Sequence, residues 1–289
     1  MHILVCTPAG EYAIRRDFPD WNCLAKMGHT FERNVASQPP DAIVGMGVEV
    51  TAETLAAIAE WPGVPLFCYN WDCYAWAWVR PRRPEWDYTM YGMMLKQATE
   101  IWVPSECTGR QTSLWWGLFN WKVILSNCTW WEYEYVRDDK FILCPLRRLP
   151  DNWCDKFEQA CTELGLPYKM PDHNLPFAEY QDLVASCSFL VNHYQEASTG
   201  GLTLLEGYYL GKPCLITDSE WNGARDYFGN RATYFRHGSM QDFKHWLRWM
   251  WECKPSVQPD HRQWVVQHYS SQRMLRNMLE RINAYIGTV

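Results

Sequence analysis

The stretch SFLVNHYQEASTGGLTLLEGYYLGKPCLITD, residues 188–218, decides the fold. It contains an apolar strand pattern, a turn of small residues, a helix pattern that ends at a glycine, and a second apolar strand pattern. A strand, a helix and a strand in this order form a βαβ unit, whose two strands run parallel in one sheet. The stretch therefore predicts an α/β fold with helices covering the faces of a parallel sheet.

The same alternation of strands and helices runs along the whole chain. The first half is predicted to contain strands at 2–8, 40–47 and 64–72, helices ending at 32 and spanning 51–61, and a helix followed by a strand in both 91–106 and 107–127. The second half is predicted to contain strands at 141–146, 167–171, 188–194 and 212–218, helices at 152–165, 176–187 and 203–211, and two closing helices at 240–252 and 261–286. We expect Thr51 to cap the helix at 51–61 through a Thr-x-x-Glu-like start.

The irregular, aromatic segment 128–140 lies between the two β/α halves. We therefore expect two Rossmann-like domains, an N-terminal one over residues 1–136 and a C-terminal one over residues 137–289, whose last helix can cross back to the first domain. No Gly/Ser-rich linker joins them, so we expect the halves to pack closely and to bind a ligand in the cleft between them.

Composition and charge exclude several classes of protein. The 27 Lys and Arg against 33 Asp and Glu give a net charge of −6, which disfavours a general nucleic-acid-binding protein. No segment approaches the roughly 18–20 apolar residues of a membrane span. The 12 cysteines are scattered singly, as is typical of free thiols in a reducing compartment. We therefore expect a cytoplasmic protein without a membrane anchor, in a bacterium or a virus-infected host cell.

A turn of small residues between a predicted strand and a predicted helix is formed by Ser198, Thr199, Gly200 and Gly201. Glycine lets a ligand approach the backbone closely, and the N–H groups at a helix start attract phosphate. Glu206, about one and a half turns into the helix, can then reach the hydroxyl pair of a ribose. An ordinary strand-to-helix turn with an exposed Glu fits the spacing equally well.

The segment GGLTLLEGYYLGKPCLITD, residues 200–218, resembles the donor-binding element of retaining GT-B glycosyltransferases of the family 4 type, which carry an E-x7-E motif. The similarity extends to 95–117, 141–161 and 176–196. It implies a GT-B fold of two Rossmann-like domains that face each other across a cleft, with 1–136 on the acceptor side and 137–289 binding the nucleotide sugar. The donor substrate is then a nucleotide diphosphate sugar, expected to be a UDP-sugar, and no cofactor is expected. The residues that the resemblance assigns to the donor are Gly10, Arg147, Arg148, Lys156, His173, Ser198, Thr199, Gly200, Gly201, Leu202 and Glu206.

The sequence departs from the family's pattern in its charged residues. Glu196 and Glu206 are ten positions apart instead of eight, so either Glu196 reaches in through a two-residue bulge or Ser198 takes its position. Arg148 and Lys156 are further apart than the family's phosphate-binding Arg and Lys. The alternative interpretation of Lys156 is an ordinary solvated residue of its helix.

The resemblance also implies how the reaction proceeds. The sugar passes to a hydroxyl with its anomeric configuration retained, and no metal ion is required. Glu196 steers the sugar ring, while Arg147, Arg148 and the amides of Gly200 and Gly201 neutralise charge that develops on the diphosphate. The sequence has no D-x-D element, and we expect the paired aspartates in 137–140 to belong to a charged loop.

The acceptor is expected to meet the aromatic and basic segment 69–91. Its polar, aromatic and basic candidates for binding the acceptor are Asn70, Trp71, Tyr74, Arg80, Arg82 and Arg83. Asp72 is predicted to be catalytic, like Glu196, and is expected to contact the acceptor hydroxyl. For Asp72 a loop-capping role is a nearly equal alternative. Aromatic faces stack on sugars and unstacked bases, and arginines bind phosphates. A proline-rich surface loop packed by tryptophan is the interpretation without a ligand.

Two acceptors stay open at this point. One is a soluble glycan or metabolite, and the other is a hydroxymethylated base in viral DNA, which must be flipped out of the duplex. Residues 1–136 hold 10 Lys and Arg against 15 Asp and Glu, a net charge of −5, so electrostatic binding to DNA is expected to be modest. A lipid acceptor ranks lower, because no basic amphipathic helix begins the chain.

An alternative of a different class is a catalytically silent protein that binds a nucleotide sugar or a glycan. The shifted Glu spacing favours it, as does the absence of the His that the family often carries in its first domain, where YNWDC stands instead. A nucleotide-sugar epimerase ranks third, because the sequence shows no clear set of catalytic carboxylates and histidines.

Overall fold

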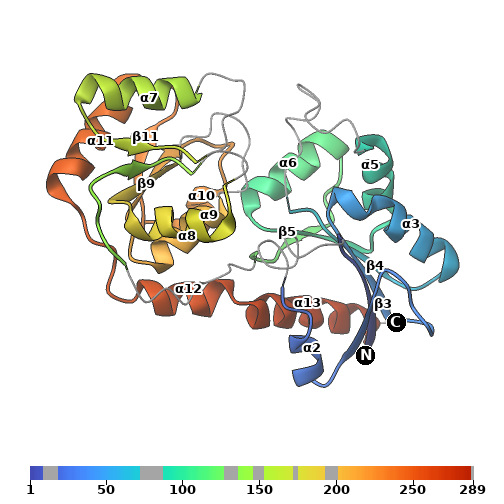
Figure 1. Ribbon diagram of the computed structural model, residues 1–289. Helices are drawn as coiled ribbons and strands as arrows, with labels where there is room; N and C mark the ends of the chain where they lie inside the picture. The colour runs from blue at the N-terminus through green and yellow to red at the C-terminus, as the bar shows by residue number, and fades with distance from the viewer. Residues whose placement is uncertain are drawn as a thin grey trace. The chain divides into compact units, whose positions relative to one another are not determined.

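Figure 1 shows the computed structural model of the chain. The structure describes residues 1–8, 19–71, 87–126, 136–145, 153–171, 175–192 and 201–287. The chain divides into two compact units, one formed by Met1–Thr129 with Gln267–Val289 and the other by Trp130–Val266. The first unit therefore includes the C-terminal helix, and the division falls slightly before the expected boundary at residue 136.

The first unit is built on a parallel sheet. Its described strands are β1 (His2–Cys6), β2 (Thr30–Arg33), β3 (Ala42–Met46), β4 (Leu66–Tyr69), β5 (Glu100–Val103) and β6 (Trp121–Val123), in the order β2-β1-β3-β4-β5-β6. Ile3 of β1 aligns with Phe31 on one side and with Ala42 on the other, and both pairings are parallel. The strand order reverses at β1, and the carboxyl ends of strands at such a reversal form the usual ligand-binding edge of an open α/β sheet.

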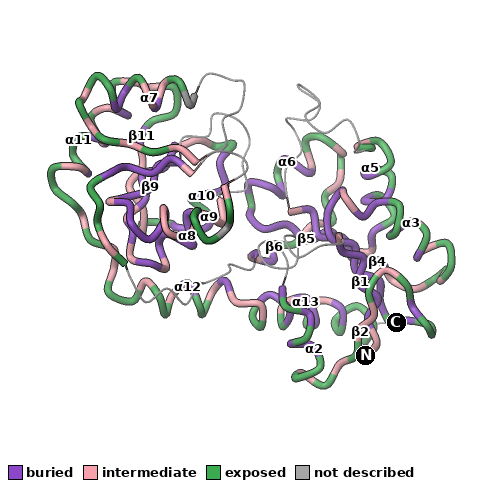
Figure 2. Tube along the Cα trace, viewed as in Figure 1, coloured by how far each residue is buried: buried purple, intermediate pink, exposed green. Residues whose placement is uncertain are grey.

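Helices cover both faces of this sheet, and its inner strands β1, β3, β4 and β5 are buried almost throughout, whereas the edge strands β2 and β6 are not (Figure 2). One face packs against α2 (Cys23–Lys26) and α13 (Ser271–Ile286), and the other against α3 (Thr51–Glu60) and α5 (Tyr88–Gln97). Helix α6 (Glu106–Trp116) connects β5 with β6. Buried residues of α13 recur at helical spacing, with Met274, Met278 and Ile282 on one stripe, so this helix belongs to the core of the first unit.

The second unit repeats the architecture. Its described strands are β7 (Ile142–Leu143), β8 (Tyr168–Lys169), β9 (Phe189–Asn192), β10 (Cys214–Asp218) and β11 (Thr233–Arg236), all parallel, in the order β11-β10-β9-β7-β8. Its helices are α7 (Trp153–Leu164), α8 (Phe177–Ser186), α9 (Leu202–Tyr209), α10 (Ala224–Phe228), α11 (Met240–Cys253) and the first part of α12 (His261–Tyr269). Helices α7 and α11 share one core with the sheet. The strand order reverses between β7 and β9.

Most predicted elements are confirmed, and the exceptions have local causes. The helix expected to end at 32 is short, because Gly28 adopts φ +81° and ends it, and Thr30–Arg33 then pairs with β1 as a strand. Thr51 is not a cap: a 3-10 turn, η1 (Val48–Val50), runs into α3, and the Thr51 hydroxyl donates to the Val48 carbonyl. The helix expected over 261–286 is two helices, since Ser270 caps α13 by accepting from the Arg273 N–H.

Two further elements were not predicted. Strand β11 and the short helix α10 lie in a stretch, residues 219–239, for which the sequence analysis assigned no structure.

The paired aspartates of 137–140 lie in a loop between elements, as expected, and Arg137 binds Asp182 of α8 through two hydrogen bonds of 2.9 and 2.8 Å.

Neither unit presents a membrane-spanning segment in its described part, where each helix is too short or too polar to cross a bilayer. The described cysteines are free thiols and all but Cys253 are buried. Burial raises the pKa of the Cys6 thiol to about 11. Such thiols stay neutral near pH 7 and act as small apolar core residues, which agrees with the sequence analysis.

Gly109 lets α6 pack against β6 at the edge of the first sheet. A Cβ atom at this position would lie 2.5 Å from Cε3 of the Trp121 ring. The ring cannot easily move, because its Nε1 donates to the Ser113 hydroxyl at 2.8 Å. We expect Gly109→Ala to lower the free energy of unfolding by about 1–3 kcal/mol, measured by urea denaturation.

The second variant of this test is Gly109→Ala combined with Trp121→Leu. It should recover part of the loss, because the smaller side chain makes room for the methyl group. A Gly109→Ala protein that is more stable than the wild type would show that helix propensity, about 1 kcal/mol in favour of Ala, outweighs this contact.

Candidate functional site

The reversal of strand order in the second unit lies between β7 and β9, the two strands that precede the predicted donor segments in the sequence. Strands β7 and β9 are neighbours, with Leu143 aligned to Leu190, and both run in the same direction. Residues 146–152 follow β7 and residues 193–200 follow β9. The carboxyl ends of the two strands therefore lie at the same edge of the sheet. Ligands bind at this edge in folds of this class.

Gly201 directly follows the second of these segments in the sequence and is the N-cap residue of helix α9. Its backbone angles are φ +81° and ψ 100°, a conformation that residues with a side chain rarely adopt. A Cβ atom there would lie 3.1 Å from Nδ2 of Asn192, the last residue of β9. The absence of a side chain thus allows the start of α9 to lie close to the end of β9.

The start of α9 is one of several helix starts in the described residues that lack a side-chain cap, with those of α2, α3, α8 and α10. Helices α5, α6, α11 and α13 begin with a side-chain cap from Asp87, Ser105, Ser239 and Ser270 respectively. No side chain caps α9 within the described residues, and its N-cap is a glycine. A helix start of this kind concentrates N–H groups and the positive end of the helix dipole, the arrangement that binds phosphate in many α/β proteins.

Glu206 lies in the second turn of α9 and is only 1% exposed. This contradicts the interpretation of an ordinary turn followed by an exposed Glu. The helix around it is fixed on both sides: Gly207 packs against Leu190 of β9, and Tyr208 packs edge-on against Trp264 with ring centres 5.6 Å apart. Burying a carboxylate costs free energy unless polar groups bind it, so Glu206 is not an ordinary solvated surface residue.

The two other described donor candidates are less deeply placed. Leu202 is the first residue of α9 and Lys156 lies in the first turn of α7, and both are half-buried. Lys156 follows the segment after β7, so it shares a sheet edge with Gly201.

Many predicted site residues lie outside the described part of the chain. These are Gly10, Asp72, Tyr74, Arg80, Arg82, Arg83, Arg147, Arg148, His173, Glu196, Ser198, Thr199 and Gly200. Their roles stay predictions, and so does the choice between Glu196 and Ser198 for the first acidic position.

Asn70 has a structural role in the first unit, and its predicted contact with an acceptor stays a prediction. It is fully buried at the end of β4, where its Nδ2 donates to the Thr112 hydroxyl at 2.8 Å and its Oδ1 accepts from the Tyr91 hydroxyl at 2.9 Å. Both ends of its amide are thus used to join β4 with α5 and α6. Sequence alone could not show this, because strand ends carry both ligand-binding and structural amides.

Trp71, the next residue, combines packing with partial exposure. Its indole packs against Gly47, which follows β3 with φ +89° and leaves no room for a side chain between them. It contacts the core cluster shared by the sheet and α13. The Trp71 side chain therefore anchors the end of β4, and its contact with an acceptor stays a prediction.

Thr7 is a buried polar residue at a strand end that the sequence analysis did not name as a site candidate. It follows β1 directly, is 3% exposed, and its Oγ1 has no hydrogen-bond partner among the described residues. Its backbone is fixed by Asn34, whose Oδ1 accepts from the Thr7 N–H at 2.9 Å and whose Nδ2 donates to the Thr7 carbonyl at 3.2 Å. Its place between β1 and the Gly10 loop, at the reversal of the first sheet, was the available signal.

Removing the Tyr91 hydroxyl tests the structural role of Asn70. We expect Tyr91→Phe to lower the free energy of unfolding by about 1–3 kcal/mol, because the buried Oδ1 of Asn70 loses its donor. The matched control is Tyr285→Phe, at a residue that is 41% exposed, which should change stability little. Equal effects of the two substitutions in urea denaturation would mean that the Asn70 amide is not held by this bond.

Comparison with known proteins identifies the type of fold. Neither models of known protein families nor curated protein sequences match the chain. Among solved structures, HepE from Anabaena in complex with UDP and glucose superimposes with a TM-score of 0.66 at 12% identity, over 98% of this chain and 100% of that one. Sucrose-phosphate synthase from Thermosynechococcus elongatus gives 0.69 at 9% identity over the whole of both chains.

A third similar structure is AviGT4, a glycosyltransferase involved in avilamycin A biosynthesis, with a TM-score of 0.62 at 13% identity, over 100% of this chain and 99% of that one. These identities are low, so the likeness concerns the fold. The two parallel α/β sheets with their covering helices match those of GT-B glycosyltransferases.

Proposed function

We propose that this protein is a glycosyltransferase that takes a sugar from a nucleotide diphosphate sugar, with a UDP-sugar as donor. The observation that carries the proposal is the reversal of strand order between β7 and β9 in the second unit. Helix α9 follows β9 in the sequence and begins at Gly201, with no side-chain cap among the described residues. The complexes of HepE with UDP and with UDP-glucose support this choice of donor.

Each donor-side group has a chemical task in this proposal. The diphosphate lies against the start of α9, where backbone N–H groups stabilise negative charge, and Arg147 and Arg148 bind it from the segment after β7. The buried carboxylate of Glu206 accepts hydrogen bonds from the ribose hydroxyls. As the glycosidic bond breaks, negative charge grows on the leaving diphosphate, and these fixed positive groups lower the barrier.

We further propose retention of the anomeric configuration and a reaction that needs no metal ion. Glu196, or Ser198 in its place, steers the transferred sugar, and Asp72 contacts the acceptor hydroxyl. Retention is measured by the anomeric configuration of the product, and metal independence by activity in the presence of a chelator.

For the acceptor, a soluble glycan or metabolite and a hydroxymethylated base in DNA remain the two candidates. The net charge of −5 over residues 1–136 favours the first, since DNA binding depends on cationic groups. An assay that offers hydroxymethylated DNA and a panel of oligosaccharides, at low and physiological salt, decides between them. The silent binding protein is the second candidate function, favoured by the shifted Glu spacing, and it predicts UDP-sugar binding without transfer or hydrolysis.

Substituting Glu206 tests the donor site. We expect Glu206→Gln to weaken UDP binding roughly 10- to 100-fold, because a hydrogen bond to a charged group contributes about 1.5–3 kcal/mol. Isothermal titration calorimetry measures the affinity, and a melting curve shows whether the variant is folded. The control is Glu252→Gln on the exposed face of α11. A folded Glu206→Gln protein with unchanged UDP affinity would remove Glu206 from the donor site.

Substituting Gly201 tests the start of α9 independently. We expect Gly201→Ala to weaken UDP binding at least 10-fold, because the new Cβ strains the backbone and crowds Asn192 at 3.1 Å. Gly211→Ala is a matched control, since Gly211 has the same φ of +81° but its nearest neighbour, His261 Nε2, is 3.6 Å away. If both variants bind UDP equally, the effect belongs to backbone strain and not to the start of α9.

A further inference from the structure

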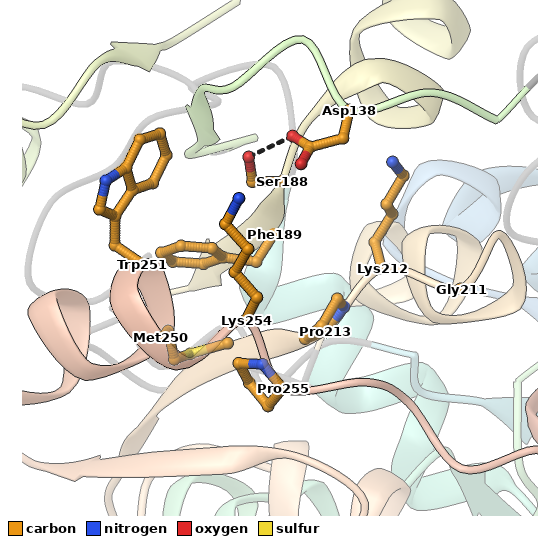
Figure 3. A pocket seen from close by; sticks show the side chains of 10 residues that line it. All are labelled: Asp138, Ser188, Phe189, Gly211, Lys212, Pro213, Met250, Trp251, Lys254 and Pro255. Carbon is orange, nitrogen blue, oxygen red and sulfur yellow. Dashed lines mark hydrogen bonds between the residues drawn. The ribbon is translucent and has the colours of Figure 1, made fainter.

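A pocket lies at the amino edge of the second sheet, where the strands begin (Figure 3). Its polar wall comes from the loop before β7, the residue before β9 and the turn before β10, and its remaining wall from the end of α11. We call it the amino-end pocket; its lining residues include Asp138, Ser188, Phe189, Lys212, Trp251 and Lys254.

The amino-end pocket has the size of one substituted ring. Its volume is about 220 Å³. A protein cavity of about 150 Å³ is large enough for benzene, a six-membered ring without substituents. Pockets for drug-sized ligands measure about 300–1,000 Å³. A single six-membered ring that carries several hydroxyl groups therefore fits this pocket, whereas a larger ligand would extend out of it.

The apolar part of the amino-end pocket is rigid and ends in an aromatic ring. Phe189 and Met250 are 3% and 0% exposed and belong to the core formed by the sheet with α7 and α11. Trp251 stands on the left of the pocket in Figure 3 and is half-buried, so part of its ring is open to a ligand. An exposed indole face of this kind packs well against the C–H groups of a sugar ring.

The polar wall contains a carboxylate that still has room for a hydrogen bond. The Asp138 carboxylate accepts from the Ser188 hydroxyl at 2.5 Å and from the N–H and the ammonium of Lys140. Burial opposes the charge of Asp138, but these hydrogen bonds outweigh it and lower the pKa of the carboxyl to about 2. A carboxylate accepts about four hydrogen bonds, so one position is left for a donor of a ligand.

Two ammonium groups supply donors to the same pocket. Lys212 is 5% exposed, and its ammonium donates to the carbonyls of Arg137 and Cys187 at 2.6 and 2.7 Å. An ammonium has three N–H donors, so one of those of Lys212 is unused among the described residues. Lys254 is exposed at the end of α11, and no carboxylate in the described part of the chain pairs with it.

Charges of both signs at the wall favour a neutral ligand. An anion would meet the Asp138 carboxylate, and a cation would meet Lys212 and Lys254. The charges just outside the wall are already paired, since Lys140 binds Asp138, and Arg137 binds Asp139 and Asp182. A hydroxyl group both donates and accepts hydrogen bonds, so an uncharged ligand with several hydroxyls satisfies the carboxylate and the ammonium groups together.

We propose that the amino-end pocket binds one hexose unit of a neutral glycan. The C–H face of the ring lies against Trp251, hydroxyls accept from Lys212 and Lys254, and one hydroxyl donates to Asp138. Because Lys254 and Asp138 are exposed, the ligand stays open to solvent on one side, where the next sugar unit can follow. The pocket is separate from the proposed donor site, because the two lie at opposite ends of the same strands.

The test uses the intact protein with UDP present at saturation, so that the donor site is occupied. The probes are the methyl glycosides of glucose, galactose and mannose, as both anomers, followed by ligand-observed NMR titration. We expect at least one of them to bind with a millimolar dissociation constant, the usual magnitude for a single sugar ring, without displacing UDP.

Three outcomes contradict the proposal. Absence of binding by every methyl glycoside, or displacement of UDP by them, overturns it. Inorganic phosphate that binds more tightly than the glycosides would make the pocket an anion site. Free hexoses that bind while their methyl glycosides do not would overturn the glycan assignment, because a sugar unit within a glycan is glycosidically linked.

Trp251→Ala locates the binding site. We expect it to weaken binding of the methyl glycoside roughly 10-fold or more, because the ring loses its stacking surface. The matched control is Trp249→Ala, which removes an indole of the same helix that is 36% exposed and packs against Trp246 outside the pocket. Equal affinity of the Trp251→Ala protein and the wild type would overturn the assignment of the sugar to this pocket.

Lys254→Gly tests the polar wall without a risk to the fold. Lysine here has φ +46°, a conformation that suits glycine, so the melting temperature should not fall. We expect binding of the methyl glycoside to weaken roughly 10-fold, since a hydrogen bond from a charged donor is lost. The control is Arg248→Ala on the exposed side of α11, which should leave the affinity unchanged. Unchanged binding to Lys254→Gly would remove this ammonium from the site.

Discussion

The close packing of α9 on β9 is the contact on which the second unit depends. Gly207 brings the helix against Leu190, and Gly201 brings its start against Asn192. Because β9 is also the strand at which the order of the sheet reverses, this packing fixes a helix start beside the end of β7. A larger residue at either glycine would separate helix from strand, and the positive end of the helix would no longer lie at that edge.

The same constraint explains why the two edges of this sheet differ in character. At the carboxyl edge the described backbone offers N–H groups and a glycine cap, with a carboxylate buried one turn further along α9. At the amino edge charged side chains are held by one another and by carbonyls, as Lys212 is. A parallel sheet creates this division, since every strand begins at one edge and ends at the other.

Much of the architecture was predictable from sequence because it depends on local patterns. Apolar strand runs, helical periodicity and glycine stops predicted the strands and most helices of both units. The errors occurred where the sequence signal was ambiguous: Thr30–Arg33 was assigned to a helix although Gly28 ends that helix, and Ser270 interrupts a helical pattern that is otherwise continuous. The site was predicted less completely. Glu206 and Gly201 were chosen from the motif, and their roles stay predictions, whereas the interior role of Asn70 and the buried hydroxyl of Thr7 depend on neighbours distant in sequence.

By itself the sequence determined that the chain forms two parallel α/β units, and it predicted a donor site at the glycine turn and Glu206. Only the tertiary structure decided what each polar residue at a strand end contacts. Asn70 turns inward because Tyr91 and Thr112 meet it from two helices. Lys212 is buried because the carbonyls of Arg137 and Cys187, far from it in sequence, accept hydrogen bonds from its ammonium group. Hydrophobic periodicity acts within an element, whereas hydrogen bonds and charges act between elements that only the fold brings together.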